Sequence, residues 1–152
     1  MTILNDIKWM KQALKQAKNA EKIGEVPVGA VIVYQNELVA CGYNKQQKKA
    51  LSISHAEIIA IINASKKRKS SNLSGCVMYV TLEPCLMCIG ALINSRIKKL
   101  VYAAKNYFYE IPLDSFFSCE INIKSGILKE ESIDLLENFF RNLRRINYYE
   151  SK

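Results

Sequence analysis

The chain has no long apolar run. None of its segments approaches the ~18 consecutive apolar residues from which a membrane-spanning helix is recognised. Its lysine-rich start also lacks the apolar stretch and cleavage site of a secretory signal. We therefore expect a cytoplasmic protein that neither spans a membrane nor is exported.

Internal repeats, low-complexity tracts and linker-like segments are missing as well. Hydrophobic residues make up 49% of the 152 residues and charged residues 24%, which is ordinary for a globular protein. We expect one domain over residues 1–152, long enough to bury a core.

Acidic residues are scarce relative to basic ones. The chain has 14 Asp and Glu against 22 Lys and Arg, a formal net charge of +8. Such an excess favours polyanionic partners, nucleic acid above all, although many small basic proteins bind none.

Histidine occurs once and cysteine five times, an odd number. In a chain without an export signal disulfides are not expected, and paired thiols are better interpreted as metal-binding or redox groups. A metal site in this chain can use one imidazole at most.

Apolar periodicity predicts alternating helices and strands. Helical spacing predicts helices at 3–22, 55–65, 85–95 and from about Ser132 to Tyr148. β-branched and apolar runs predict strands at 28–34, 37–43, 76–82 and 98–104, with 120–123 as a candidate fifth. Gln35-Asn36 is short enough for a hairpin turn, and the charged segment 66–75 reads as an exposed connection. This order predicts an α/β fold, a mixed sheet with helices on both faces.

Cys85 and Cys88 follow a predicted strand and Pro84, at the start of a predicted helix. Their i, i+3 spacing brings both sulfurs to one side of the helix. A helix N-terminus favours negative charge, which helps both cysteines to act as thiolate ligands. Two thiolates do not complete a zinc site, which takes three or four protein ligands.

The single histidine, His55, also stands at a predicted helix start, and Glu57 follows two residues later. One histidine and two cysteines give three ligands and an open fourth position, as in catalytic zinc sites. Glu57 suits proton transfer better than ligation. Residues i and i+2 diverge by about 200° around a helix, so His55 and Glu57 converge only if the helix end points at the metal.

Two other interpretations of the cysteine pair are open at this point. A pair after a strand and at a helix start also resembles a thioredoxin-like redox site, and free cysteines are often inert core residues. Neither interpretation has a use for His55 together with Glu57, so we favour metal binding.

The pattern H-x-E…P-C-x-x-C is the signature of zinc nucleobase deaminases. Through it the chain resembles the cytidine-deaminase-like superfamily. It resembles more narrowly the bacterial tRNA adenosine deaminases, through "EVPVGAVIV" (25–33), "GYN" (42–44), "HAEI" (55–58), "TLEPCLMCIGALINSRI" (81–97) and "GIL…LLENFFRNLRR" (126–145). The resemblance implies a three-layer α/β/α fold with a five-stranded mixed sheet. It also implies a homodimer in which each active site is completed by the neighbouring subunit.

Roles for individual residues also follow from the resemblance. It implies one Zn²⁺ per subunit, bound by His55, Cys85 and Cys88, with Glu57 as the proton shuttle. It further implies that Asn44 hydrogen-bonds the target nucleoside and that Val26 lines the base pocket.

The chain departs from the family between Lys105 and Ile121, where it reads "KNYFYEIPLDSFFSCEI". Asn106 stands where the family has an Asp, and bulky aromatic residues follow it. In the family this region contacts RNA near the flipped base, so the departure concerns substrate selection and leaves the zinc chemistry untouched.

The last predicted helix carries Phe140 within an apolar stripe that favours core packing. Arg144 lies one turn further along, beside other arginines. Aromatic rings and guanidinium planes also stack on single-stranded RNA bases, so Phe140 and Arg144 are candidate substrate contacts.

Together these observations predict zinc-dependent deamination of adenosine to inosine at the wobble position of a tRNA anticodon stem-loop. The main alternative is a free-base deaminase for guanine or cytosine, which shares the zinc motif but has no need of the basic charge. A non-catalytic RNA-binding module with structural zinc is a further alternative, and Glu57 argues against it, because a structural site needs no proton shuttle.

Overall fold

The computed structural model describes residues 2–107 and 120–150 and contains one mixed sheet. Five strands lie in the order β2-β1-β3-β4-β5. Their bounds are β1 Gly29–Tyr34, β2 Glu37–Tyr43, β3 Val77–Leu82, β4 Lys99–Ala104 and β5 Asn122–Ser125. β1 pairs antiparallel with β2 and β3, and β3–β4 and β4–β5 are parallel. The predicted mixed five-stranded sheet is confirmed.

The first two strands form the predicted hairpin. Gln35 and Asn36 have φ angles of 48° and 61°, the left-handed conformation that a two-residue type I′ turn requires at both positions. The fifth strand begins two residues later than predicted, because Ile121 is buried ahead of it and pairing with β4 starts at Asn122 opposite Lys99.

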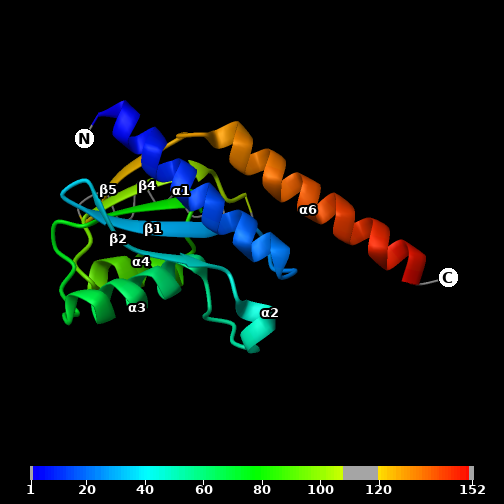
Figure 1. Cartoon of the computed structure of the whole chain (residues 1–152), viewed down its shortest axis with the longest axis horizontal. Coiled ribbons are helices and arrows are strands. Elements are labelled where there is room, and N and C mark those ends of the chain that lie inside the picture. Colours follow the sequence, from blue (N-terminus) through cyan, green and yellow to red (C-terminus); the bar gives the residue numbers. More distant parts are fainter. Residues whose placement is uncertain (1, 108–119, 151–152) are drawn as a thin grey trace.

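Helices cover both faces of the sheet, as Figure 1 shows. One face carries α1 (Ile3–Lys22) and α6 (Lys129–Glu150), and the other carries α3 (Ala56–Arg68) and α4 (Leu86–Asn94). A single turn, α2 (Gln46–Lys49), lies in a segment predicted to be loop. None of the helices in the described ranges is both long and apolar enough to cross a bilayer.

Two helices are longer than predicted. α3 continues to Arg68 rather than ending at 65, because the basic residues of its last turn suit the negative end of a helix, and Lys69 ends it in a left-handed conformation with φ 52°. The connection after it therefore starts at Lys69. α6 begins at Lys129 rather than Ser132, and two acidic residues occupy its first turn.

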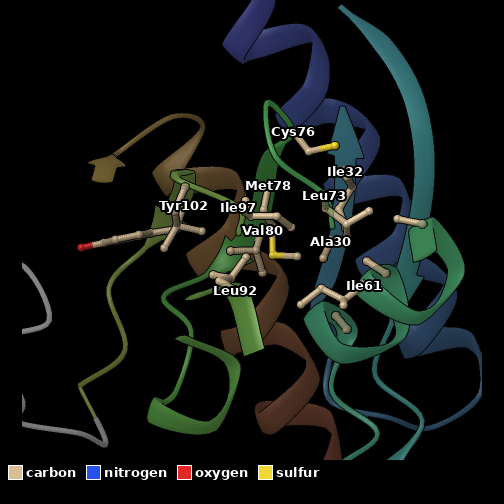
Figure 2. Packing of buried hydrophobic residues seen from close by; sticks show 14 of the residues in the cluster. Ala30, Ile32, Ile61, Leu73, Cys76, Met78, Val80, Leu92, Ile97 and Tyr102 are labelled. Atoms are coloured by element: carbon tan, nitrogen blue, oxygen red, sulfur yellow. The ribbon is translucent and has the colours of Figure 1, made fainter. Parts of the chain in front are cut away.

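The core lies in two layers, one on each side of the sheet. Alternate residues of β1 and β3 point to opposite faces, which explains why both strands are apolar throughout. Figure 2 shows the layer beneath α3 and α4, where Ala30, Ile32, Met78 and Val80 pack against Ile61 and Leu92. The layer beneath α1 contains Trp9, Met10, Val31, Val33 and Tyr79.

A buried polar network fixes α1 on its face of the sheet. Asp6 of α1 is 4% exposed and accepts a hydrogen bond from the Tyr79 hydroxyl at 2.8 Å. Lys124 of β5 forms an ion pair with the same carboxylate. Burial, followed by the contact with Asp6, raises the pKa of Tyr79, so the phenol stays protonated and donates to the carboxylate.

Two glycines allow helices to approach the sheet closely. A Cβ at Gly29 would lie 2.2 Å from the Ala13 carbonyl oxygen of α1. A Cβ at Gly42 of β2 would lie 2.3 Å from the Ala56 carbonyl oxygen and 2.6 Å from the Ala60 nitrogen of α3. Gly42 therefore sets the position of the first turn of α3.

We predict that Gly42→Ala destabilises the fold by about 2 kcal/mol, since the new methyl group meets helix backbone that cannot rotate away. Gly90→Ala in α4 is the matched control. Its Cβ meets nothing within 4 Å, so it should stabilise the protein by up to ~1 kcal/mol through helix propensity. Urea unfolding of both variants checks this, and equal stabilities would contradict the close packing of α3.

Candidate metal centre and active site

Two helix starts meet at the candidate site. His55 is the N-cap residue of α3, and Cys85 is the N-cap residue of α4. Both have extended backbone, with ψ angles of 154° and 169°, so each chain turns into its helix at the site. Cys88 follows within the first turn of α4. The starts of both helices therefore lie at the three candidate donor side chains.

The three side chains form a nearly equilateral triangle. The His55 Nδ1 atom lies 3.7 Å from the Cys85 sulfur and 3.6 Å from the Cys88 sulfur, and the two sulfurs are 3.7 Å apart. Metal–ligand distances of about 2.3 Å for sulfur and about 2.0 Å for nitrogen place tetrahedral ligands roughly 3.5–3.8 Å apart. The triangle therefore fits a tetrahedral metal with one position left over, and the sulfur separation is far from that of a disulfide.

The electrostatics of the cysteine pair also suit a cation. A hydrogen bond from Cys88, together with His55, lowers the pKa of the Cys85 thiol to about 4. The same bond and burial raise the pKa of Cys88. Without a cation the pair therefore holds one negative charge. A divalent metal would stabilise both thiolates, helped by the positive ends of α3 and α4.

Glu57 lies in the first turn of α3 and is only 3% exposed. Burial raises the pKa of its carboxyl group to about 7, although the nearby His55 acts in the opposite direction. It follows His55 by two residues at the start of α3, and its charge is one of the causes that raise the pKa of Cys88. A carboxyl group that titrates near neutrality can both accept and return protons.

Asn44 and Val26 lie in the segments around this centre. Asn44 follows β2 and is buried, and its Oδ1 atom accepts a hydrogen bond from the Ala56 backbone N–H at 3.0 Å. It therefore stabilises the start of α3, next to His55. The Asn44 backbone N–H donates to the Val28 carbonyl at 3.1 Å. Val26 is half-buried and stands two residues before Val28, so it belongs to the segment that lies beside Asn44.

Asn106 is hydrogen-bonded to Glu83, a buried carboxylate that was not among the predicted site residues. Glu83 is 5% exposed, and its carboxylate accepts hydrogen bonds from the Asn106 backbone N–H at 2.9 Å and from the Tyr102 hydroxyl at 3.3 Å. It thus ties the residues just before Cys85 to the end of β4. The sequence offers one signal, a carboxylate directly between an apolar strand and Pro84, because a carboxylate that is buried there needs hydrogen-bond partners.

Glu25 is a second buried carboxylate that was missed. It is 2% exposed and accepts a hydrogen bond from the Lys48 backbone N–H at 2.7 Å. This bond attaches α2 to the segment before β1. The loop between β2 and α3, which leads to His55, is therefore held by Asn44, which joins its start to α3, and by Glu25, which holds α2 in its middle.

Phe140 and Arg144 are not brought to the metal ligands. Both lie on α6, on the opposite side of the sheet from α3 and α4, and Figure 1 shows α6 extending beyond the rest of the molecule. Phe140 is half-buried in an edge-to-face contact with Phe139, and Arg144 is exposed. Most of the divergent segment 105–121 lies outside the described residues.

A family model described as MafB19-like deaminase matches residues 4–144. The chain belongs to this deaminase family. The fold agrees, because the mixed sheet and its two helical layers are shared with solved deaminases.

Similar proteins within the deaminase family include a tRNA-specific adenosine deaminase of Buchnera aphidicola from Schizaphis graminum. It is 43% identical over 145 residues, which cover 91% of this chain and 96% of the relative. A solved tRNA:A34 deaminase, described in connection with A-to-I editing at the wobble position, is 32% identical with a TM-score of 0.77. The match covers 85% of this chain and 99% of that one. A guanine deaminase of Nitrosomonas europaea is 27% identical with a TM-score of 0.76, and the match covers 88% of this chain and 83% of that one.

We predict that Cys85→Ala purifies with little or no divalent metal, because two remaining ligands are too few for a stable site. The wild-type protein should carry about one metal ion per chain, measured by inductively coupled plasma mass spectrometry. Cys41→Ala is the control, since Cys41 is a half-buried cysteine in β2. Full metal content in Cys85→Ala would refute the ligand assignment.

Proposed function

We propose that this protein is a zinc-dependent deaminase that converts adenosine to inosine at the wobble position of a tRNA anticodon, as one deaminase domain acting in the cytoplasm. The observation that carries the proposal is the triangle of His55, Cys85 and Cys88, with the buried Glu57 in the first turn of the helix that starts at His55. The 43% identity to a tRNA-specific adenosine deaminase over nearly the whole chain supports the substrate class.

His55, Cys85 and Cys88 would hold the zinc ion. Bound zinc would bring the pKa of a coordinated water towards ~7 and so supply the nucleophile at neutral pH. In a duplex or stacked loop the adenine C6 atom is shielded, so the target nucleotide has to be flipped out of the stack. Asn44 and Val26, in the segments around the metal centre, are the residues that we propose for holding it.

Glu57 moves the protons of the reaction. It accepts one proton from the attacking water and delivers it to N1 of the adenine ring. It then accepts the remaining proton, from the new C6 hydroxyl group, and delivers it to the departing 6-amino group. The C6–N bond breaks, a C6–O bond forms, and ammonia leaves, so water and adenosine become inosine and ammonia. The raised pKa of Glu57 suits a group that has to accept and release a proton twice in one turnover.

RNA contacts by Asn106, Phe140 and Arg144 belong to this proposal. The Asn106 backbone N–H donates to Glu83, which stands two residues before Cys85, and this supports a role for Asn106 near the base. Phe140 and Arg144 lie on α6, which extends beyond the sheet in Figure 1, so this helix could reach RNA outside the base pocket. Stacking and charge at these positions would support RNA binding without taking part in the chemistry.

We expect wild-type protein to form inosine in an anticodon stem-loop that bears a wobble adenosine, and to release no ammonia from free guanine or cytosine. Glu57→Gln should lower the rate by at least 10²-fold, since general acid–base catalysis by one group contributes this much or more. Its metal content should stay near that of the wild type.

Two outcomes would contradict this proposal, one about the substrate and one about the role of Glu57. Ammonia from a free base with the RNA unchanged would keep the zinc chemistry and replace the substrate. A Glu57→Gln enzyme with near-normal turnover would remove the proton shuttle from the proposal, whatever the substrate.

The homodimer is also part of the proposal. Large apolar side chains are exposed on α3 and α4, the layer that contains the metal centre; they are Ile62 (47%), Leu86 (46%) and Met87 (37%). Leu86 directly follows the candidate ligand Cys85. A second copy of the chain packed on these residues would bury them and would stand next to the active site.

We predict a dimer for wild-type protein by light scattering after gel filtration, and a monomer for Ile62→Glu, because burying an unpaired carboxylate opposes association. Leu4→Glu is the control, since Leu4 is 74% exposed on α1, on the other face of the sheet. A dimeric Ile62→Glu protein, or dissociation of both variants, would rule out this interface.

A further inference from the structure

α1 carries a stripe of lysines along its outer face. Lys8, Lys11, Lys15, Lys18 and Lys22 follow one another at intervals of three and four residues, the spacing that keeps side chains on one side of a helix. All of these lysines are exposed. From Lys8 to Lys22 the stripe is about 21 Å long, at 1.5 Å of helix per residue.

The stripe lacks the partners that surface lysines of a helix commonly have. Exposed helices usually alternate charges so that Glu and Lys pair at i, i+4, whereas lysines at this spacing repel each other and destabilise the helix. Among the side chains described, those of residues 2–107 and 120–146, the single ion pair joins Lys124 to Asp6, on the buried side of α1. Lys8 lies over the Trp9 ring, 4.4 Å from its centroid, but none of the five lysines has an acidic partner among these residues, so the stripe suits an external polyanion.

One end of the stripe lies nearer to the metal centre than the other. Ala13 and Ala17 of α1 lie against Gly29, the first residue of β1. The Gly29 N–H donates to the Thr81 hydroxyl at 3.1 Å, near the end of β3, from which the chain continues to Cys85. Lys18 and Lys22 therefore lie near this end of the strands, on the side of the metal centre. The other lysines of the stripe lie progressively further from it.

We propose that this lysine stripe binds the phosphate backbone of the substrate tRNA outside the anticodon loop. The inference rests on the proposed function for the identity of the RNA. α1 lies on the opposite side of the sheet from α3 and α4, so the stripe cannot touch a base held at the metal centre. We expect the stripe to contact phosphate groups of the stem that adjoins the anticodon loop.

The chemistry of the stripe fits backbone contacts. Lysine ammonium groups on flexible stems act as point charges for phosphate and read no sequence, and the stripe contains no arginine to contact bases bidentately. A DNA duplex carries about one phosphate charge per 1.7 Å of axis, and an RNA stem is similarly charged, so a stripe of this length faces on the order of ten phosphates.

The test compares two triple variants that each lower the net charge by three. The first, Lys11→Gln, Lys15→Gln and Lys18→Gln, neutralises the centre of the stripe. The matched control, Lys66→Gln, Lys67→Gln and Lys69→Gln, neutralises exposed lysines at the far end of α3 from His55. Circular dichroism and thermal unfolding establish that both variants fold.

The Kd of each protein for a full-length tRNA transcript with a wobble adenosine is measured between low and moderate salt, together with kcat and KM for inosine formation. We expect the stripe variant to raise Kd and KM about tenfold at moderate salt, with kcat within twofold of wild type. The slope of log Kd against log salt should fall by about 2–3, since each lost phosphate contact removes about one. The control should change Kd less than twofold.

Equal effects of the two variants, or no change in Kd, would overturn the proposal, because the stripe would then act only through net charge or not at all. Loss of binding to phosphatidylglycerol vesicles in the stripe variant, with an unchanged Kd for tRNA, would overturn it in favour of a lipid surface. If wild-type protein forms no inosine in RNA, the proposed function is wrong. The Kd values of the stripe variant and the control variant for tRNA still test whether the stripe binds RNA.

Discussion

Two thiols whose sulfur atoms lie 3.7 Å apart cannot both be ionised unless positive charge stands nearby. In this protein the N-terminal ends of α3 and α4, which meet at Cys85 and His55, supply part of that charge, and a cation held by the triangle of donors would supply the rest. The arrangement requires two helices on the same face of the sheet, and both helices have to start at the same end of the strands. The order of the strands and the close approach of α3 at Gly42 provide it.

Buried carboxylates hold the loops of this edge in place. Glu83 connects the residues before Cys85 to the end of β4, and Glu25 attaches α2 to the segment before β1. Each accepts backbone N–H groups, so a charged side chain supplies hydrogen bonds that strand pairing does not provide at an irregular edge. Glu57 is also buried, but burial raises its pKa, which suits proton transfer rather than support.

The two faces of the sheet have different tasks in our interpretation. The face with α3 and α4 carries the metal centre and exposed apolar residues, which suit chemistry and a second subunit. The face with α1 and α6 carries the lysine stripe and Arg144, which suit a long polyanion. A free-base deaminase needs the first face only. The lysine stripe of α1 is therefore a physical argument for RNA that does not depend on the names of similar proteins.

Much of the fold and the chemistry could be predicted from the sequence, because the relevant signals are local. The spacing of Cys85 and Cys88, the single histidine two residues before Glu57, the hairpin turn at Gln35-Asn36 and the apolar periodicity of α1 each depend on neighbouring residues only. The tertiary structure decided what depends on distant residues. It set the start of β5 through pairing with β4, and it gave Asn44, Glu25 and Glu83 their backbone partners. It also placed Phe140 and Arg144 across the sheet from the metal centre, because the face that a helix covers is fixed by packing and chain topology, on which the pattern of a single helix carries no information.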